Sequence, residues 1–186
     1  MQERENIIDI LEKTKKALKE DNVIAIKDLS NRTIHSASIA QDPDNVNIAV
    51  IIYSLGKIIE RTRYQEMPGW SKFENLYEDS LENALVALKR KDIDAYRGQI
   101  DRIKEAVSRL SGRLKKYIED IFRKTKINKA SRLYEHGLSR ERAAKILGVT
   151  QWELAQYVGQ TGIADVDLAY TLDIKQRIKN AEEMFK

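Results

Sequence analysis

The sequence predicts an all-α protein, in which a bundle of about five helices precedes a smaller helical region. Proline is scarce, with two residues in 186, and no stretch alternates apolar and polar residues as a half-buried strand does. Apolar residues instead recur at spacings of three and four, which is the period of an amphipathic helix. We expect residues 1–125 to form the bundle and residues 126–186 the smaller region.

The composition argues against several kinds of metal and catalytic site. The chain has no cysteine, which excludes disulfides and thiolate metal sites, and its two histidines argue against a histidine-rich one. No Walker sequence or catalytic carboxylate pair occurs, so we expect no metal, no cofactor and no enzymatic activity. The N-terminus MQERENIIDI lacks the layout of a signal peptide, and no run of eighteen apolar residues exists. We therefore expect a cytoplasmic protein without a membrane partner. The Lys, Glu, Arg and Ile content is typical of archaeal or thermophile proteins.

Capping and turn signals bound the first four helices, which we expect near residues 3–19, 23–40, 46–63 and 71–89. The third carries IAVIIYSLGKII, which is apolar nearly all round, so it should be the most buried element. The expected capping residues are Asp21 or Asn22 for the second helix, Asp44 or Asn45 after Pro43 for the third, and Ser71 with Glu74 for the fourth.

A heptad stripe follows over four repeats and predicts one long helix with a narrow packing seam. The seam could pack inside the bundle, which we favour, or against a second copy of the chain. A short helix over residues 127–136 should come next, ended by Gly137. The stripe consists of Ile93, Tyr96, Ile100, Ile103, Val107, Leu110, Leu114, Tyr117 and Ile121.

Residues 138–159, LSRERAAKILGVTQWELAQYVG, predict two short helices around a tight turn. Ser139 can cap the first helix and Gly148 can end it, because glycine tolerates the left-handed conformation. Thr150 and Glu153 have the spacing of a capping box for the second. A further helix is expected over residues 174–185, with Asp165 or Asp167 as a cap upstream.

This stretch resembles the helix-turn-helix of bacterial and archaeal transcription regulators. Ala144 is small where the helices would approach, and the inward positions are apolar. The resemblance implies that the second helix lies in the major groove of double-stranded DNA. Trp152 departs from the small or polar residue usual there. The alternative is a helical hairpin that contacts a protein. The residues expected to face the bases are Thr150, Gln151, Trp152, Ala155 and Gln156.

Charge adds to the DNA-binding interpretation, although a basic patch taken alone would favour a merely solvated face. Residues 121–150 contain eight basic and two acidic residues, a net charge of +6, whereas the whole chain has a net charge of +4. A local basic patch is what phosphate binding requires. The residues expected to contact phosphates are Lys129, Arg132, Arg140, Arg142 and Lys145.

Polar residues on one face of the second predicted helix suggest either a nucleotide or acid–base site or a structural polar stripe, and we favour the stripe. They are Asp28, Asn31, Arg32, His35 and Ser38.

Residues 1–125 also resemble HEPN domains, which are helical bundles, often dimeric, of prokaryotic nucleases and nucleotide-binding proteins. The likeness rests on this polar-faced helix and the apolar helix after it. Nuclease members carry an Arg, four to six residues and a His. Here the pairs Arg32–His35 and Arg132–His136 enclose two and three residues, so the resemblance does not imply ribonuclease activity.

Together these patterns predict a sequence-specific DNA-binding protein, a homodimeric transcription regulator that could also take a small ligand. Two alternatives remain open. The bundle could act on nucleotides or RNA, or the chain could be a helical protein-interaction adaptor.

Overall fold

The computed structural model describes residues 3–40, 42–61 and 64–161. These residues form α-helices and no strand, which confirms the all-α prediction. The predicted helix at residues 174–185 and its caps lie outside the described residues. The helices are α1 (Arg4–Lys19), α2 (Val23–Ala40), α3 (Pro43–Ile59), α4 (Trp70–Lys89), α5 (Ile93–Arg109), α6 (Gly112–Glu135), α7 (Arg140–Leu147) and α8 (Gln151–Thr161).

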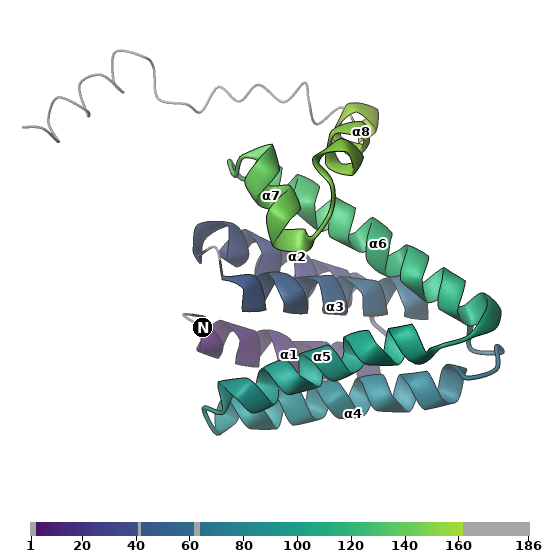
Figure 1. Ribbon diagram of the computed structural model, residues 1–186. Helices are drawn as coiled ribbons and strands as arrows, with labels where there is room; N and C mark the ends of the chain where they lie inside the picture. The colour runs from purple at the N-terminus through teal and green to yellow at the C-terminus, as the bar shows by residue number, and fades with distance from the viewer. Residues whose placement is uncertain (1–2, 41, 62–63, 162–186) are drawn as a thin grey trace, which may run out of the picture.

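The helices are stacked in tiers (Figure 1). Helices α4 and α5 form an antiparallel pair on one side, α1 lies next to them, and α2 and α3 pack together in the middle. Helix α6 runs obliquely from the end of α5 to the opposite side, where it contacts α7 and α8. None of the described helices is long and apolar enough to cross a membrane.

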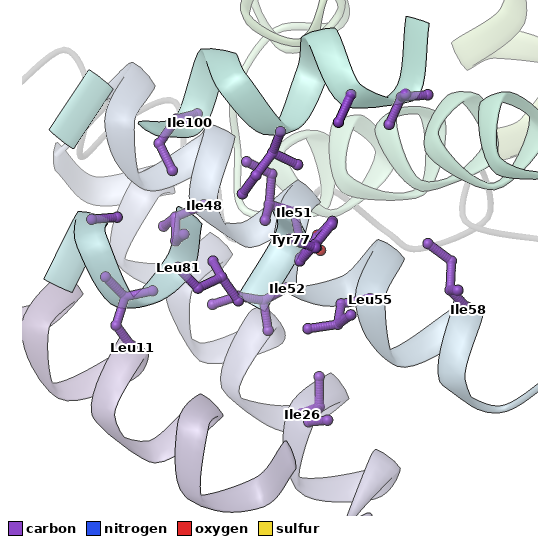
Figure 2. Close-up of a cluster of buried hydrophobic side chains, with 14 of the residues drawn as sticks. Leu11, Ile26, Ile48, Ile51, Ile52, Leu55, Ile58, Tyr77, Leu81 and Ile100 are labelled. Atoms are coloured by element: carbon purple, nitrogen blue, oxygen red, sulfur yellow. The ribbon is translucent and has the colours of Figure 1, made fainter. Parts of the chain in front are cut away.

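The main hydrophobic core contains residues from each of the helices α1 to α6 (Figure 2). Helix α3 contributes Ile48, Ile51, Ile52, Leu55 and Ile58 to it. Twelve of the seventeen residues of α3 are buried, a larger share than in any other described helix. The prediction that this helix is the most buried is therefore confirmed, because an all-round apolar surface requires neighbours on every side.

A second hydrophobic cluster joins the last helices to the bundle. Ala49 and Val50 of α3 pack in it with Leu133 of α6, Leu147 of α7 and Leu154 of α8. The boundary predicted between residues 125 and 126 falls inside α6, and residues from both sides of it share this cluster. The bundle and the C-terminal helices are thus held together by a common core.

The long helix predicted from the heptad stripe is wrong. The chain breaks at Leu110, which is extended, and at Gly112, which has a φ of +60°. The stripe keeps its period across the break because α5 and α6 bury their apolar sides in the same core. The separate helix predicted for residues 127–136 is the last part of α6. The apolar stripe from Ile93 to Ile121 therefore packs within the chain.

Two of the predicted caps are corrected. Helix α3 begins at Pro43, whose fixed φ suits the first helical position, so Asp42 caps it instead of Asp44 or Asn45. Helix α4 begins at Trp70 after Gly69 in the left-handed conformation, without a capping box from Ser71. Asn22 caps α2 as predicted, since its Oδ1 accepts the Ala25 N–H at 3.0 Å.

Candidate nucleic-acid interface

The turn between α7 and α8 has the local geometry that the sequence predicts. The Ser139 hydroxyl caps α7 by accepting the Arg142 N–H at 3.2 Å, and Gly148 ends the helix with a φ of +62°. Thr150 and Glu153 form the capping box. The Glu153 N–H donates to Thr150 Oγ1 at 3.1 Å, and the Thr150 N–H donates to Glu153 Oε2 at 3.0 Å. The Thr150 hydroxyl also donates to Glu153 Oε2, and the two hydrogen bonds that Thr150 donates to this carboxylate lower the pKa of Glu153.

Small and apolar residues fix α7 and α8 against α6. Ala143, Ala144 and Leu147 of α7 are buried, as are Leu154 and Val158 of α8. Of the other predicted inward residues, Val149 and Tyr157 are half-buried, and the Tyr157 hydroxyl accepts a hydrogen bond from the Asn128 side chain of α6 at 3.0 Å. Three helices thus share one small core, and one side of α8 is committed to it.

The other side of α8 faces solvent and bears no charge. Thr150, Gln151, Trp152 and Gln156 are exposed, and Ala155 is half-buried. Trp152 is 79% exposed, so it does not turn inward against the chain. The five residues predicted to contact bases therefore lie together along the first turns of one helix, on a side that is open to a ligand such as the edges of base pairs in a DNA groove.

The basic residues divide into exposed and buried groups. Arg140, Arg142 and Lys145 are exposed on α7, next to the uncharged side of α8. Arg132 is exposed on α6 and pairs with Glu135 at 2.7 Å. Lys129 is 0% exposed, so its assignment as a phosphate contact is corrected: its ammonium group lies inside the protein.

Lys129 instead joins α6 to the bundle. Its Nζ donates to Asn31 Oδ1 of α2 at 2.8 Å and lies 4.0 Å from the centroid of the Tyr53 ring of α3. Burial, and secondly the charge of Arg132, lowers the pKa of Lys129 to about 7. Thr125 and Leu133, one helical turn before and after Lys129, are also buried, so Lys129 lies on the inward side of α6.

The polar face predicted on α2 does not converge on one site. Asp28 and Arg32 line a cavity of about 330 Å³ beside α1. Asn31 is engaged by Lys129, and the Ser38 hydroxyl donates to the main-chain carbonyl of His35 at 2.6 Å.

The His35 ring faces a different neighbour, the ring of His136 on α6, at a centroid distance of 4.9 Å. The pKa of His136 is lowered by burial and by His35. Two of the polar residues of α2, Asn31 and His35, therefore contact residues at the end of α6, whereas the hydrogen bond of Ser38 lies within α2 itself.

Among the described residues, no group of His, Cys, Asp and Glu side chains is arranged to hold a metal ion. Comparisons with protein-family models, curated proteins and solved structures found no match to this chain.

Replacement of the α7 cap tests the local stability of the turn unit. Ser139→Ala should lower the free energy of unfolding by about 1 kcal/mol, because it leaves a helix N–H without its acceptor. Ser111→Ala is the matched control, since Ser111 precedes α6 without a side-chain capping bond and should change stability by much less. Urea denaturation measures both. Equal losses would contradict a specific role for the Ser139 hydroxyl.

The buried ammonium predicts a pH-dependent stability. An unfolded lysine keeps its proton up to a pH of about 10.4, whereas Lys129 in the folded protein loses it near pH 7. Between these values the unfolded state binds more protons, so stability should rise with pH by at most about 1.4 kcal/mol per pH unit. Denaturation at pH 7, 8 and 9 should show that Lys129→Met loses this slope and that the exposed Lys116→Met keeps it. The assignment of the slope to Lys129 would be contradicted if the free energy of unfolding changed with pH in the same way for the parent protein and for both variants.

Proposed function

We propose that this protein is a sequence-specific DNA-binding protein, a dimeric transcription regulator that inserts α8 into the major groove. One observation carries the proposal: α8 packs one side against α6 and α7 and leaves an uncharged, hydrogen-bonding side exposed at the edge of the molecule. A helix held in this way can enter the major groove without being pulled from its core.

The exposed side chains of α8 have the chemistry of base recognition. Gln151 and Gln156 can each form two hydrogen bonds with an adenine edge. The Thr150 hydroxyl is engaged with Glu153, so its methyl group is the part that could contact a thymine methyl. Trp152 would supply apolar contact with a sugar or a thymine. The helix thus combines two side chains for hydrogen bonds to bases, Gln151 and Gln156, with apolar groups of Thr150 and Trp152.

The exposed basic residues of α7 would hold the DNA backbone. In a helix-turn-helix the first helix crosses the phosphates while the second occupies the groove. Arg140, Arg142 and Lys145 are exposed on α7 and fit this role. Arg132 fits it if a phosphate replaces Glu135 as its partner. Since one short helix contacts few base pairs, two copies on half-sites about 34 Å apart would be needed for specificity.

A second candidate function rests on Trp152. A tryptophan that is 79% exposed on an uncharged helix surface is also typical of a protein-binding hot spot. In this adaptor function the same side of α8 would contact a protein, and binding would depend little on salt. The two candidates therefore differ in the ligand and in the salt dependence of binding.

Selection from a random duplex pool, followed by sequencing, should enrich a short palindrome. Against that site Gln151→Ala and Gln156→Ala should each lose about 1–3 kcal/mol of binding free energy and relax the preference at one position of each half-site. Gln65→Ala is the control, because Gln65 is exposed in the turn before α4. Unchanged binding by both α8 variants would contradict the base-reading assignment.

Salt dependence tests the backbone contacts separately. Arg140→Gln should weaken binding to all sequences alike and should reduce the slope of log K against log salt by about 0.9 for each lost phosphate contact. Fluorescence anisotropy at several salt concentrations measures the slope, with the exposed Lys116→Gln on α6 as the control. A slope unchanged by Arg140→Gln would remove this residue from the interface. Absence of DNA binding at any salt concentration would favour the adaptor function.

A further inference from the structure

A cavity of about 710 Å³ opens where the helix-turn-helix meets the bundle. Residues of α3, α5, α6, α7, α8 and the α7–α8 turn line it, and we call it the junction cavity. Its volume lies within the range of sites that take small organic ligands, about 300–1,000 Å³. A molecule bound here would touch both the bundle and the unit that carries α8.

Part of the wall of the junction cavity is apolar. Phe122 of α6, Ile146 of α7 and Val149 of the turn line it and are only half-buried, so each retains apolar surface that is open to solvent. Val50 and Val107 are buried behind them. A ligand with an apolar body would gain free energy by covering this surface.

The rim of the junction cavity carries more basic than acidic side chains: Lys104, Arg123, Lys126 and Lys145 line it, against Glu119 and Glu153. Glu119 pairs with Lys115, which lies outside the cavity, at 3.9 Å. Of its cations, Lys104 pairs with Asp101 at 2.9 Å and Arg123 pairs with Glu153 at 3.3 Å. The other two, Lys126 and Lys145, are exposed and form no ion pair or side-chain hydrogen bond with any residue that the structure describes.

These two ammonium groups come from α6 and α7, on elements that also provide the apolar wall. The cavity therefore combines apolar side chains in its wall with two lysines that have no ion-pair partner among the described residues. This combination complements a molecule with an apolar body and one anionic end.

We propose that the junction cavity binds an amphipathic carboxylate, with its apolar body against Phe122, Ile146 and Val149 and its carboxylate between Lys126 and Lys145. Charge complementarity selects this occupant over a neutral or cationic one of the same size, because each lysine offers a charge-assisted hydrogen bond to the carboxylate. The apolar wall selects it over inorganic phosphate, which would leave that surface uncovered.

Occupancy of the cavity would also oppose DNA binding, and this step rests on the proposed function. Lys145 belongs to the residues that would hold phosphates, and Val149 lies in the turn that positions α8. A carboxylate bound to Lys145 takes that cation from the DNA backbone. Because such coupling is reciprocal, DNA should weaken carboxylate binding by the same factor.

Calorimetry of the full chain with sodium decanoate, below its micelle concentration and without DNA, tests the site itself. We expect one decanoate per chain and much weaker binding of decyltrimethylammonium, which has the same tail and the opposite charge. Lys126→Gln and Lys145→Gln should each weaken decanoate binding by about tenfold. Lys116→Gln, which changes an exposed lysine outside the cavity, should not. Ile146→Thr should also weaken it, with thermal unfolding used to verify that this variant is folded.

The outcomes separate the site from the proposed function. Equal binding of both surfactants, or binding that neither lysine variant changes, would overturn the carboxylate site and indicate nonspecific association of the alkyl tail. Decanoate binding by a protein that binds no DNA would uphold the site and refute the proposed function. DNA binding without decanoate binding would do the reverse. Where both bind, decanoate should weaken the parent protein's DNA binding and should have little effect on that of Lys126→Gln.

Discussion

The fold depends on the burial of α3 on all of its sides. Ile48, Ile51 and Ile52 pack in the main core, while Val46, Ala49 and Val50 belong to the cluster shared with α7 and α8. A helix that is apolar all round needs partners on each side, so the chain must return to α3 after the first bundle helices are formed. Helix α6 makes that return. Leu114, Ile118 and Ile121 near its start belong to the main core, and Ala130 and Leu133 near its end to the second cluster.

The arrangement around Lys129 adds a polar constraint to this apolar frame. Burying an ammonium group is costly unless polar groups surround it. Here Asn31 Oδ1 accepts a hydrogen bond from Lys129 Nζ at 2.8 Å, and the Tyr53 ring presents its face to the ammonium group. These partners come from α2 and α3, so the end of α6 has one orientation in which the ammonium group keeps both of them. Because α6 also supports α7 and α8, the position of the exposed α8 surface is tied to the bundle.

The two surfaces to which we assign a function are those that helix packing leaves exposed to solvent. Helix α8 is short and packs Leu154 and Val158 into the core, so within the part of the chain that the structure describes its exposed side is the one with Gln151, Trp152 and Gln156. The junction cavity arises for a related reason. The α7–α8 turn approaches α3, α5 and α6 without filling the space between them. Apolar side chains and two lysines that have no ion-pair partner among the described residues therefore lie together there. The ligand site proposed next to α8 would thus be a consequence of how the two hydrophobic clusters meet.

The sequence by itself determined those features of the protein that depend on interactions between residues close together in the chain. The helical class follows from the apolar period, the burial of α3 from its all-round apolar run, and the turn at 148–150 from Ser139, Gly148, Thr150 and Glu153, whose partners lie within a few residues. The candidate α8 surface could be predicted for the same reason, since the inward positions Leu154 and Tyr157 leave the opposite side for solvent.

Tertiary structure alone decided the features that join distant segments. The stripe from Ile93 to Ile121 keeps its period through the break at Leu110 and Gly112, because two helices that face one core carry the same pattern as a single long helix. Lys129 belonged by charge to the basic patch, yet its position between α2 and α3 buries it, and only Asn31, 98 residues away in sequence, shows why that is tolerated. Likewise the junction cavity is lined by residues of α3, α5, α6, α7, α8 and the α7–α8 turn, and no local sequence pattern predicts a space between segments that lie so far apart in the chain.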